Sequence, residues 1–311
     1  MTAPIPHLPS ASLAPLGTGD LAAEITAQLS TQLCRVRLHG FHHPEKPAPT
    51  LVAVAHGSRD PRALPTVRAL LDRVRALRPG LAVRLGHIEL NQPLLADTLA
   101  GLRGEAVLVP LLFGRGHHVT HDLPAALAAA PHLTGRVAAP LGPHTLLAEA
   151  LHGRLLEAGF PGVPSPRTAV VLAAAGSRAP RSAQDTERTA QLLSARLGGI
   201  PVLPAYASAL PSPATTPARD ASRRPSQTAL TVADAVRTLT ARGHDRIAVA
   251  GCFTAPGRFA TQCAAAAPGT AAEPLGDHPA LARLVLHRYD QALLARNGSD
   301  PERVRAATVA V

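Results

Sequence analysis

Three side chains that can bind metal and accept protons follow short apolar segments in the first half of the sequence. His56 directly follows the run Leu51–Ala55, Glu89 follows the next apolar run, and His118 lies in the turn after the third. Two imidazoles and one carboxylate suit a divalent metal of intermediate softness, such as Fe, Co, Ni or Zn. Imidazole also accepts protons near neutral pH. The three residues therefore predict a site for metal binding, proton transfer or both.

Each of these side chains also has an ordinary structural interpretation. The sequence contains 15 histidines, and Glu89 by itself could be a solvated carboxylate. His87 and His121 lie near the candidate residues in the sequence and receive no role. The remaining histidines, among them His144 and His278, are interpreted as surface or incidental residues. The meeting of three such side chains at one edge of a sheet is what favours a functional site.

The segments around these residues alternate between strand and helix patterns. Leu51–Ala55 is short, apolar and partly β-branched, which is typical of a buried strand. Leu64, Val67, Leu71 and Val74 recur every three or four residues and predict an amphipathic helix. The same patterns predict strands at Val83–Ile88 and Ala106–Leu112 and helices at Pro93–Leu102 and Leu123–Ala129. This alternation predicts a parallel sheet with helices on both faces, and such sheets bind ligands beyond the carboxyl ends of their strands.

The pattern then repeats in the second half of the chain. Thr168–Ala174 predicts a strand, and the following Ala175-Gly-Ser-Arg-Ala-Pro180 aligns with His56-Gly-Ser-Arg-Asp-Pro61. Further strands are predicted at Pro201–Ala207 and Ile247–Phe253, and a helix carries Ala183, Ala190, Leu193 and Leu197. Phe259 takes the position of His118, and the counterpart of Glu89 falls near Ala207. Because alanine and phenylalanine cannot bind a metal, the second half is predicted to retain the scaffold and to lack the ligands.

We therefore predict an α/β protein of two similar domains, each a parallel sheet flanked by helices, with a cleft between them. The first domain spans residues 49–160 and carries the intact site, and the second spans 167–296 and carries the degenerate one. Residues 1–48 are predicted to be an irregular N-terminal extension and residues 297–311 a tail. A stretch at 211–228 is rich in Pro, Ser and Arg and predicts a loop.

The composition argues against several other classes of protein. The net charge is +10, but the basic residues are scattered and only 2% of the residues are aromatic, which disfavours nucleic-acid binding. Three cysteines without CxxC spacing disfavour a disulfide framework or a zinc–sulfur site. The N-terminus lacks a signal-peptide pattern, and no apolar run is long enough to span a membrane. We expect a cytoplasmic protein with no membrane partner.

Three motifs give the chain a family resemblance. Leu51–Pro61 (LVAVAHGSRDP), Gly86–Pro93 (GHIELNQP) and Val109–Pro124 (VPLLFGRGHHVTHDLP) together resemble the sirohydrochlorin chelatases. These are the class II chelatases, which are related in fold to ferrochelatase. The similarity extends from about residue 50 to about residue 295. The segment Leu284–Leu293 (LVLHRYDQAL) is similar to the end of the long, two-repeat actinobacterial members.

The resemblance implies that the protein inserts a divalent metal into sirohydrochlorin, a tetrapyrrole with eight carboxylates. It assigns metal binding and proton uptake to His56 and His118, with Glu89 completing the site. The metal is a substrate, Fe²⁺ for sirohaem in the first place and Co²⁺ for cobalamin in the second, and no organic cofactor is expected. Since both roles need neutral imidazole, activity should fall below about pH 6.5. Fusion of the two repeats suggests a monomer.

The turns that carry the two histidines also supply the expected substrate-binding residues: Ser58, Arg59, Arg62, Arg115, Gly116 and His117. The guanidinium groups match the geometry of the substrate's carboxylates. Ser58 and Gly116 could instead serve helix capping and turn geometry. His117 could substitute for or assist His118, although the His-Val pairing in the resemblance favours His118. The alternative function is a tetrapyrrole- or metal-binding delivery protein without turnover.

Overall fold

The computed structural model describes residue 28 and residues 47–161, 165–207 and 230–297. The predicted loop at 211–228, nearly all of the predicted N-terminal extension and nearly all of the predicted tail lie outside these residues. The described chain from Ala48 onward belongs to one compact unit.

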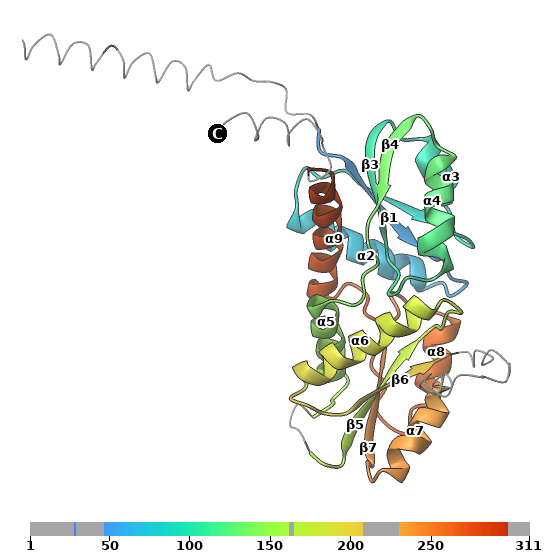
Figure 1. The fold of residues 1–311 in the computed structure, drawn as a ribbon, viewed down its shortest axis with the longest axis vertical. Coiled ribbons are helices and arrows are strands. Elements are labelled where there is room, and N and C mark those ends of the chain that lie inside the picture. Colours follow the sequence, from blue (N-terminus) through green and yellow to red (C-terminus); the bar gives the residue numbers. More distant parts are fainter. Residues whose placement is uncertain (1–27, 29–46, 162–164, 208–229, 298–311) are drawn as a thin grey trace, which may run out of the picture. The chain divides into compact units, whose positions relative to one another are not determined.

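The first half contains a four-stranded parallel sheet (Figure 1). Its strands are β1 (Thr50–Ala55), β2 (Val83–His87), β3 (Gly104–Pro110) and β4 (Leu133–Val137), in the order β2-β1-β3-β4. Helix α2 (Ala63–Leu77) packs on one face of β1, and α3 (Leu95–Ala100) and α4 (Leu123–Ala128) pack on the other. The predicted parallel sheet with helices on both faces is confirmed.

The second half repeats this arrangement with a three-stranded parallel sheet. Its strands are β5 (Thr168–Ala174), β6 (Val202–Tyr206) and β7 (Arg246–Gly251), in the order β6-β5-β7. An isolated parallel bridge between Val249 and Ala271 stands where the first half has β4. Helix α6 (Pro180–Arg196) packs on one face, and α7 (Val232–Ala241) and α8 (Arg258–Ala265) lie on the other. Two similar α/β sheets are therefore present, as predicted.

The last helix of each half packs against the other half. Helix α9 (Pro279–Asn297) follows the second sheet in the sequence but contacts α2 and β3 of the first half (Figure 1). Helix α5 (Thr145–Glu157) follows the first sheet but contacts α6 and β7 of the second half. The two helices also contact each other, and one apolar cluster runs without a break through both halves. This reciprocal exchange was not predicted.

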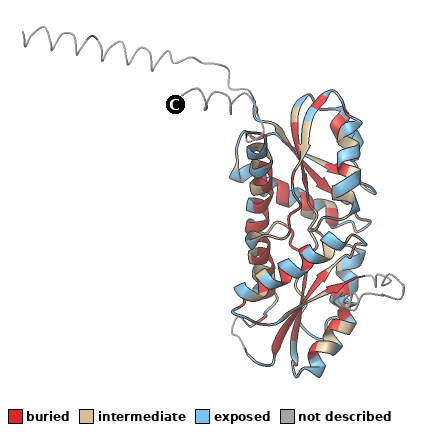
Figure 2. Ribbon diagram, viewed as in Figure 1, coloured by how far each residue is buried: buried red, intermediate tan, exposed pale blue. Residues whose placement is uncertain are grey.

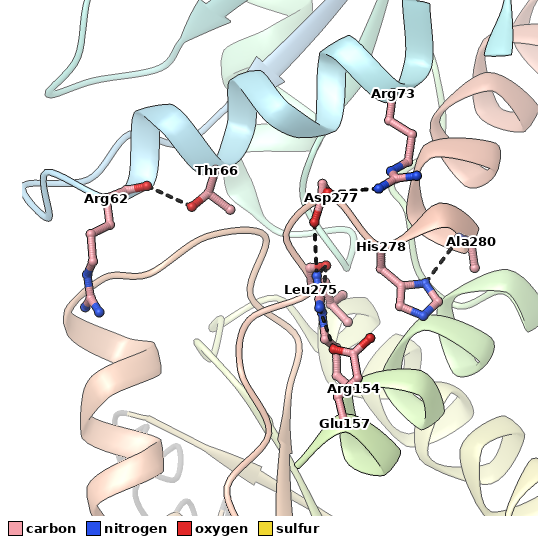
Figure 3. A network of polar contacts seen from close by, with 9 residues as sticks. All are labelled: Arg62, Thr66, Arg73, Arg154, Glu157, Leu275, Asp277, His278 and Ala280. Atoms are coloured by element: carbon pink, nitrogen blue, oxygen red, sulfur yellow. Dashed lines mark hydrogen bonds and ion pairs between the residues drawn. The ribbon is translucent and has the colours of Figure 1, made fainter. Parts of the chain in front are cut away.

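A polar network fixes the loop before α9 to two helices of the first half, α2 and α5 (Figure 3). Asp277 accepts hydrogen bonds from Arg73 of α2 at 3.0 Å and from Arg154 of α5 at 3.4 Å. Arg154 also donates to the carbonyl oxygen of Leu275 at 2.9 Å. The hydrogen bond from Arg73 holds the pKa of the Asp277 carboxyl below its usual value. The network therefore stabilises the position of α9 beside α2.

Both exchanged helices begin with a histidine cap. The Nδ1 atom of His144 accepts a hydrogen bond from the amide of Leu146 at 3.1 Å, and Nδ1 of His278 accepts one from Ala280 at 3.2 Å. Only a neutral imidazole can accept in this way. Burial lowers the pKa of both side chains, and that of His144 falls from 6.5 to about 4. The interpretation of these two histidines as incidental was wrong, because each one caps a helix.

The buried residues lie mainly in the strands and on the inward faces of the helices (Figure 2). Residues Leu51–Val54 of β1 are fully buried, as are Ala169–Ala173 of β5. Both central strands are thus covered on both faces, which is typical of parallel sheets. Among the helices that the structure describes, none combines the length and the apolar character that crossing a membrane requires.

Candidate active site

His56 and Glu89 meet beyond the carboxyl ends of β1 and β2. The pairing of the two strands continues past their ends, because the amide of Ile88 donates to Ala55 at 2.9 Å and that of Glu89 donates to His56 at 3.0 Å. Nδ1 of His56 then lies 3.5 Å from Oε1 of Glu89. Gly57 has a φ of +105°, and a Cβ at this position would lie 1.9 Å from the Glu89 carbonyl oxygen. Only glycine allows the two segments to approach so closely.

His118 reaches the same place from the end of β3. The segment after β3 stays beside β1, since the amide of Leu111 donates to Val54 at 2.8 Å. His118 then begins η1 (His118–Asp122), a single π-helical turn that leads directly into α4. Its ring centroid lies 4.9 Å from that of His56, with the ring planes 82° apart. The structure thus brings the three predicted residues together at one sheet edge, where their side chains are all partly exposed.

Asp122 is a member of this group that the sequence analysis missed. Its Oδ2 atom lies 2.6 Å from Nδ1 of His118, and its Oδ1 atom lies 3.4 Å from Nε2 of His117. A carboxylate at Nδ1 favours the tautomer whose free lone pair is on Nε2, the usual arrangement of a metal-binding histidine. The signal was present in the sequence, because His118 and Asp122 are four residues apart in a helical segment.

The histidines and carboxylates are near one another without forming a closed ligand set. Within the described residues, no group of three or more His, Cys, Asp or Glu side chains is arranged to hold a metal ion. The side chains of His56, Glu89 and His118 are 43%, 53% and 36% exposed. Side chains with this much freedom can rotate toward a shared ion. The arrangement therefore suits transient binding of a metal ion better than permanent binding.

Two of the expected substrate-binding residues lie where the two halves touch. The hydroxyl of Ser58 donates to the carbonyl of Pro256 at 3.2 Å, and a Cβ at Gly257 would lie 3.0 Å from this hydroxyl. Reciprocally, a Cβ at Gly116 would lie 3.3 Å from Oγ of Ser177. Ser58 and Gly116 thus pack the turns of one half against those of the other. Contact of either residue with a substrate remains a prediction.

The three arginines on these turns differ in what they contact. Arg115 makes a two-pronged ion pair with Asp185 of α6, with distances of 3.0 and 2.5 Å, and this carboxylate is only 1% exposed. Arg62 pairs in the same way with Asp60 and lowers the pKa of that carboxyl to about 2. Arg59 is exposed. Arg115 and Arg62 thus pair with carboxylates of the chain itself, and contact of any of the three arginines with a substrate remains a prediction.

Backbone hydrogen bonds identify the counterparts of these residues in the second half. The amide of Cys252 donates to Ala173 at 2.8 Å, which repeats the bond between Leu111 and Val54. Counting onward from these equivalent bonds gives Ala175 as the counterpart of His56, Phe259 as that of His118 and Cys263 as that of Asp122. Phe259 is 36% exposed, and the guanidinium of Arg258 lies 5.5 Å from its ring centroid. Burial raises the pKa of the Cys263 thiol to about 11.

The counterpart of Glu89 differs by one residue from the expectation. The amide of Ala207 donates to Ala174 at 2.9 Å, as that of Ile88 donates to Ala55. Ala207 therefore corresponds to Ile88. The position that corresponds to Glu89 is residue 208, which lies outside the described residues.

Comparison with known sequences points to one family. The sequence model of the CbiX family matches residues 50–158. Curated relatives from Methanosarcina acetivorans and Methanococcoides burtonii are both named sirohydrochlorin cobaltochelatase. Each is 28% identical over 123 residues, which cover 35% and 34% of this chain and 95% and 94% of the relatives. The family match thus falls on the half that carries His56, Glu89 and His118.

Solved structures resemble both halves of the chain. Sirohydrochlorin chelatase SirB from Bacillus subtilis subspecies spizizenii, in complex with cobalt, aligns with a TM-score of 0.59 and 18% identity. The alignment covers 81% of this chain and 97% of SirB. CbiX, described as the terminal enzyme of sirohaem biosynthesis in denitrifying bacteria, aligns with a TM-score of 0.57 and 22% identity over 78% of this chain and 99% of that protein. At these identities the likeness shows the fold.

Proposed function

We propose that this chain is a sirohydrochlorin chelatase, an enzyme that inserts a divalent metal into the tetrapyrrole, since the CbiX family model matches residues 50–158. The observation that carries the proposal is the approach of two imidazoles to 4.9 Å beside Glu89, at the carboxyl edge of a parallel sheet. The metal-insertion site is proposed to consist of His56, His118 and Glu89. Ligands of this kind suit divalent metals that prefer nitrogen.

The geometry supports different roles for the two nitrogens of each ring, with Nδ1 facing a carboxylate and Nε2 binding the metal. Asp122 accepts the Nδ1 hydrogen of His118, and Glu89 lies near Nδ1 of His56, so that both Nε2 lone pairs are available to the metal. As the metal moves from Nε2 to the pyrrole nitrogens, two N–H protons must leave the macrocycle. The imidazoles that have just released the metal can accept them, with the carboxylate of Glu89 as a further acceptor.

The second half is proposed to form the opposite wall of the tetrapyrrole pocket. Ala175 and Phe259 offer no metal ligand, but the exposed Phe259 ring can contact the face of a flat macrocycle. Arg59, Arg178 and Arg258 are all exposed and are proposed to meet substrate carboxylates. A net charge of +10 favours the approach of a substrate with eight carboxylates.

Iron and cobalt both remain candidates for the inserted metal. Both ions accept imidazole and carboxylate ligands. The curated relatives are named cobaltochelatases, whereas the similar CbiX structure is described as an enzyme of sirohaem biosynthesis. We propose Fe²⁺ as the first candidate and Co²⁺ as the second, and an insertion assay with both ions present would rank them directly.

The chain is further proposed to act as a monomer in the cytoplasm, with sirohydrochlorin as its partner. Two sheets whose strand-end turns pack together within one chain can supply both walls of the pocket. The monomer would be checked by light scattering of the purified protein.

The deciding experiment is an anaerobic assay of the purified protein with sirohydrochlorin and either Fe²⁺ or Co²⁺, followed by the absorbance of the macrocycle. Repeated turnover well above the uncatalysed rate is expected. The double variant His56→Ala/His118→Ala is the matched control and should return the rate to the uncatalysed value. If the wild type stops after one equivalent of product, the chain is a delivery protein. If it binds the tetrapyrrole and never exceeds the uncatalysed rate, the proposed activity is wrong.

A further inference from the structure

His117 and His121 form a second pair of imidazoles beside the candidate active site. Their ring centroids are 4.6 Å apart and their planes differ by 15°. The His117 side chain is 71% exposed, and His121 is also exposed. Histidines four residues apart on one side of a helix are a common pair of metal ligands. His121 has no part in the chemistry proposed above, so the pair requires its own explanation.

Thr120 orients the His121 ring for metal binding. Its hydroxyl donates to the carbonyl of Gly116 at 3.1 Å, and the same oxygen lies 2.8 Å from Nδ1 of His121. A hydroxyl has one hydrogen to donate, so when Gly116 receives it the oxygen accepts the Nδ1 hydrogen of His121. The lone pair of His121 is then on Nε2, the nitrogen that lies farther from the backbone. This tautomer leaves Nε2, the nitrogen with the longer reach, free to bind a metal ion.

Asp122 links this outer pair to the inner site. One carboxylate oxygen lies 3.4 Å from Nε2 of His117, and the other lies 2.6 Å from Nδ1 of His118. The ring of His118 in turn lies 4.9 Å from that of His56. Groups that can bind a metal therefore follow one another from the exposed surface to His118 and His56, which form the inner pair.

We propose that His117 and His121 form a loading site, which takes the substrate metal ion from solvent and passes it to His118 and His56. The purpose of this site rests on the proposed function, whereas its capacity to bind a metal does not. Two imidazoles completed by water bind a divalent ion weakly, which suits an ion that must move on. Because the two rings lie nearly parallel, the exposed His117 side chain must rotate for both nitrogens to face one ion.

Direct binding tests the site without sirohydrochlorin. Co²⁺ is titrated into the full-length protein by equilibrium dialysis, in the background His56→Ala/His118→Ala that lacks the inner pair. One weakly bound Co²⁺ is expected to remain, and either His117→Ala or His121→Ala should abolish it. His132→Ala is the control, since His132 is an exposed histidine just before β4, at the other end of the strands. Binding that survives both outer substitutions would overturn the proposal.

Steady-state kinetics test whether a metal ion bound at His117 and His121 is passed on to the inner pair. In the otherwise wild-type enzyme, His121→Ala should raise the KM for Co²⁺ by about tenfold, the scale of a lost chelate, and raise the KM for sirohydrochlorin much less. Because a chelate needs both rings, the double variant should differ little from either single one. Equal changes in both KM values, or single effects that multiply in the double variant, would contradict a loading role. Loss of Co²⁺ binding in a protein without insertion activity would instead reject the proposed function and leave the metal site standing.

Discussion

The turn after β1 and the turn after β5 have similar backbone conformations and differ in the side chains that could bind a metal. Both continue as Gly-Ser-Arg, and both glycines have a positive φ, +105° at Gly57 and +96° at Gly176. The first turn carries His56 and the second carries Ala175. The same contrast holds at the next turn, where His118 in one half corresponds to Phe259 in the other. The two halves thus differ at the positions that could touch a metal and agree at positions that shape the chain.

The helix caps extend this comparison. His144 and His278 cap the two exchanged helices through equivalent hydrogen bonds. These imidazoles are partly buried and accept hydrogen bonds from backbone amides, and one is present in each half. The comparison teaches that a histidine retained in both halves belongs to the scaffold, whereas a histidine found in one half is a candidate for chemistry. Four sets of substitutions, ordered from the largest expected effect to the smallest, test this separation.

Replacing His56 with alanine should have the largest effect. The rate of metal insertion is expected to fall about a thousandfold, because the proposed metal ligand and proton acceptor is lost. The fold should be unaffected, since the side chain is 43% exposed. The insertion assay and thermal unfolding measure the two parts separately. A variant with full activity would show that the site assignment is wrong.

The pair His118→Ala and Phe259→Ala tests the asymmetry directly. Loss of His118 should lower the insertion rate about a hundredfold, whereas loss of Phe259 should change it only a few-fold, as a wall of the pocket would. Both variants are measured with saturating metal and sirohydrochlorin. Losses of similar size would mean that the second half takes part in catalysis.

Asp122→Asn should have an intermediate effect. An amide cannot match the carboxylate that holds Nδ1 of His118 at 2.6 Å, and residues behind a metal ligand typically contribute about tenfold to metal affinity or activity. The matched substitution is Cys263→Ala, which should leave the insertion rate within about twofold, because this thiol is buried in the apolar cluster of the second sheet. Equal effects on the affinity for Co²⁺ would remove the distinction between the halves at this position.

His144→Asn should have the smallest effect, on stability alone. The folded state lowers the pKa of His144 from 6.5 to about 4, so the unfolded chain binds the proton more readily. The free energy of unfolding should therefore decrease as the pH falls from 6.5 to 4, by about 1 kcal/mol after allowance for solvent screening. Asparagine retains a cap acceptor and does not titrate, so the variant should lack this part of the pH dependence.

His278→Asn is the companion variant, and denaturant unfolding at several pH values is the measurement. Both substitutions should flatten the profile, because burial lowers the pKa of both histidines. A wild-type profile that neither substitution alters would show that the caps do not titrate as proposed.

Local patterns in the sequence predict the strands and the three inner residues well. The apolar, β-branched runs around Leu51 and Thr168 need no distant information, and the carboxyl ends of parallel strands necessarily lie at one edge. The patterns fail for β4 and α5. Strand β4 has only one buried residue, Leu133, and α5 lies between the two halves with buried residues on several sides. Neither element shows a clean alternation or a single apolar stripe.

Contacts between distant residues could not be predicted in the same way. The carboxylate partner of Arg115 is Asp185, which lies in the other half of the chain. No local pattern joins two residues so far apart. Asp122 is a different case, because its spacing of one helical turn from His118 is visible in the sequence.

The position of α9 has a consequence for how the protein is made. During synthesis, His56 and His118 leave the ribosome long before the helix that covers their sheet. The nascent first half therefore exposes an unfinished apolar surface, through Leu51 and its neighbours, until the second half has also emerged. His56 and His118 gain a finished core only when both repeats are complete, so a prematurely terminated chain would carry these two histidines without the packing that holds them.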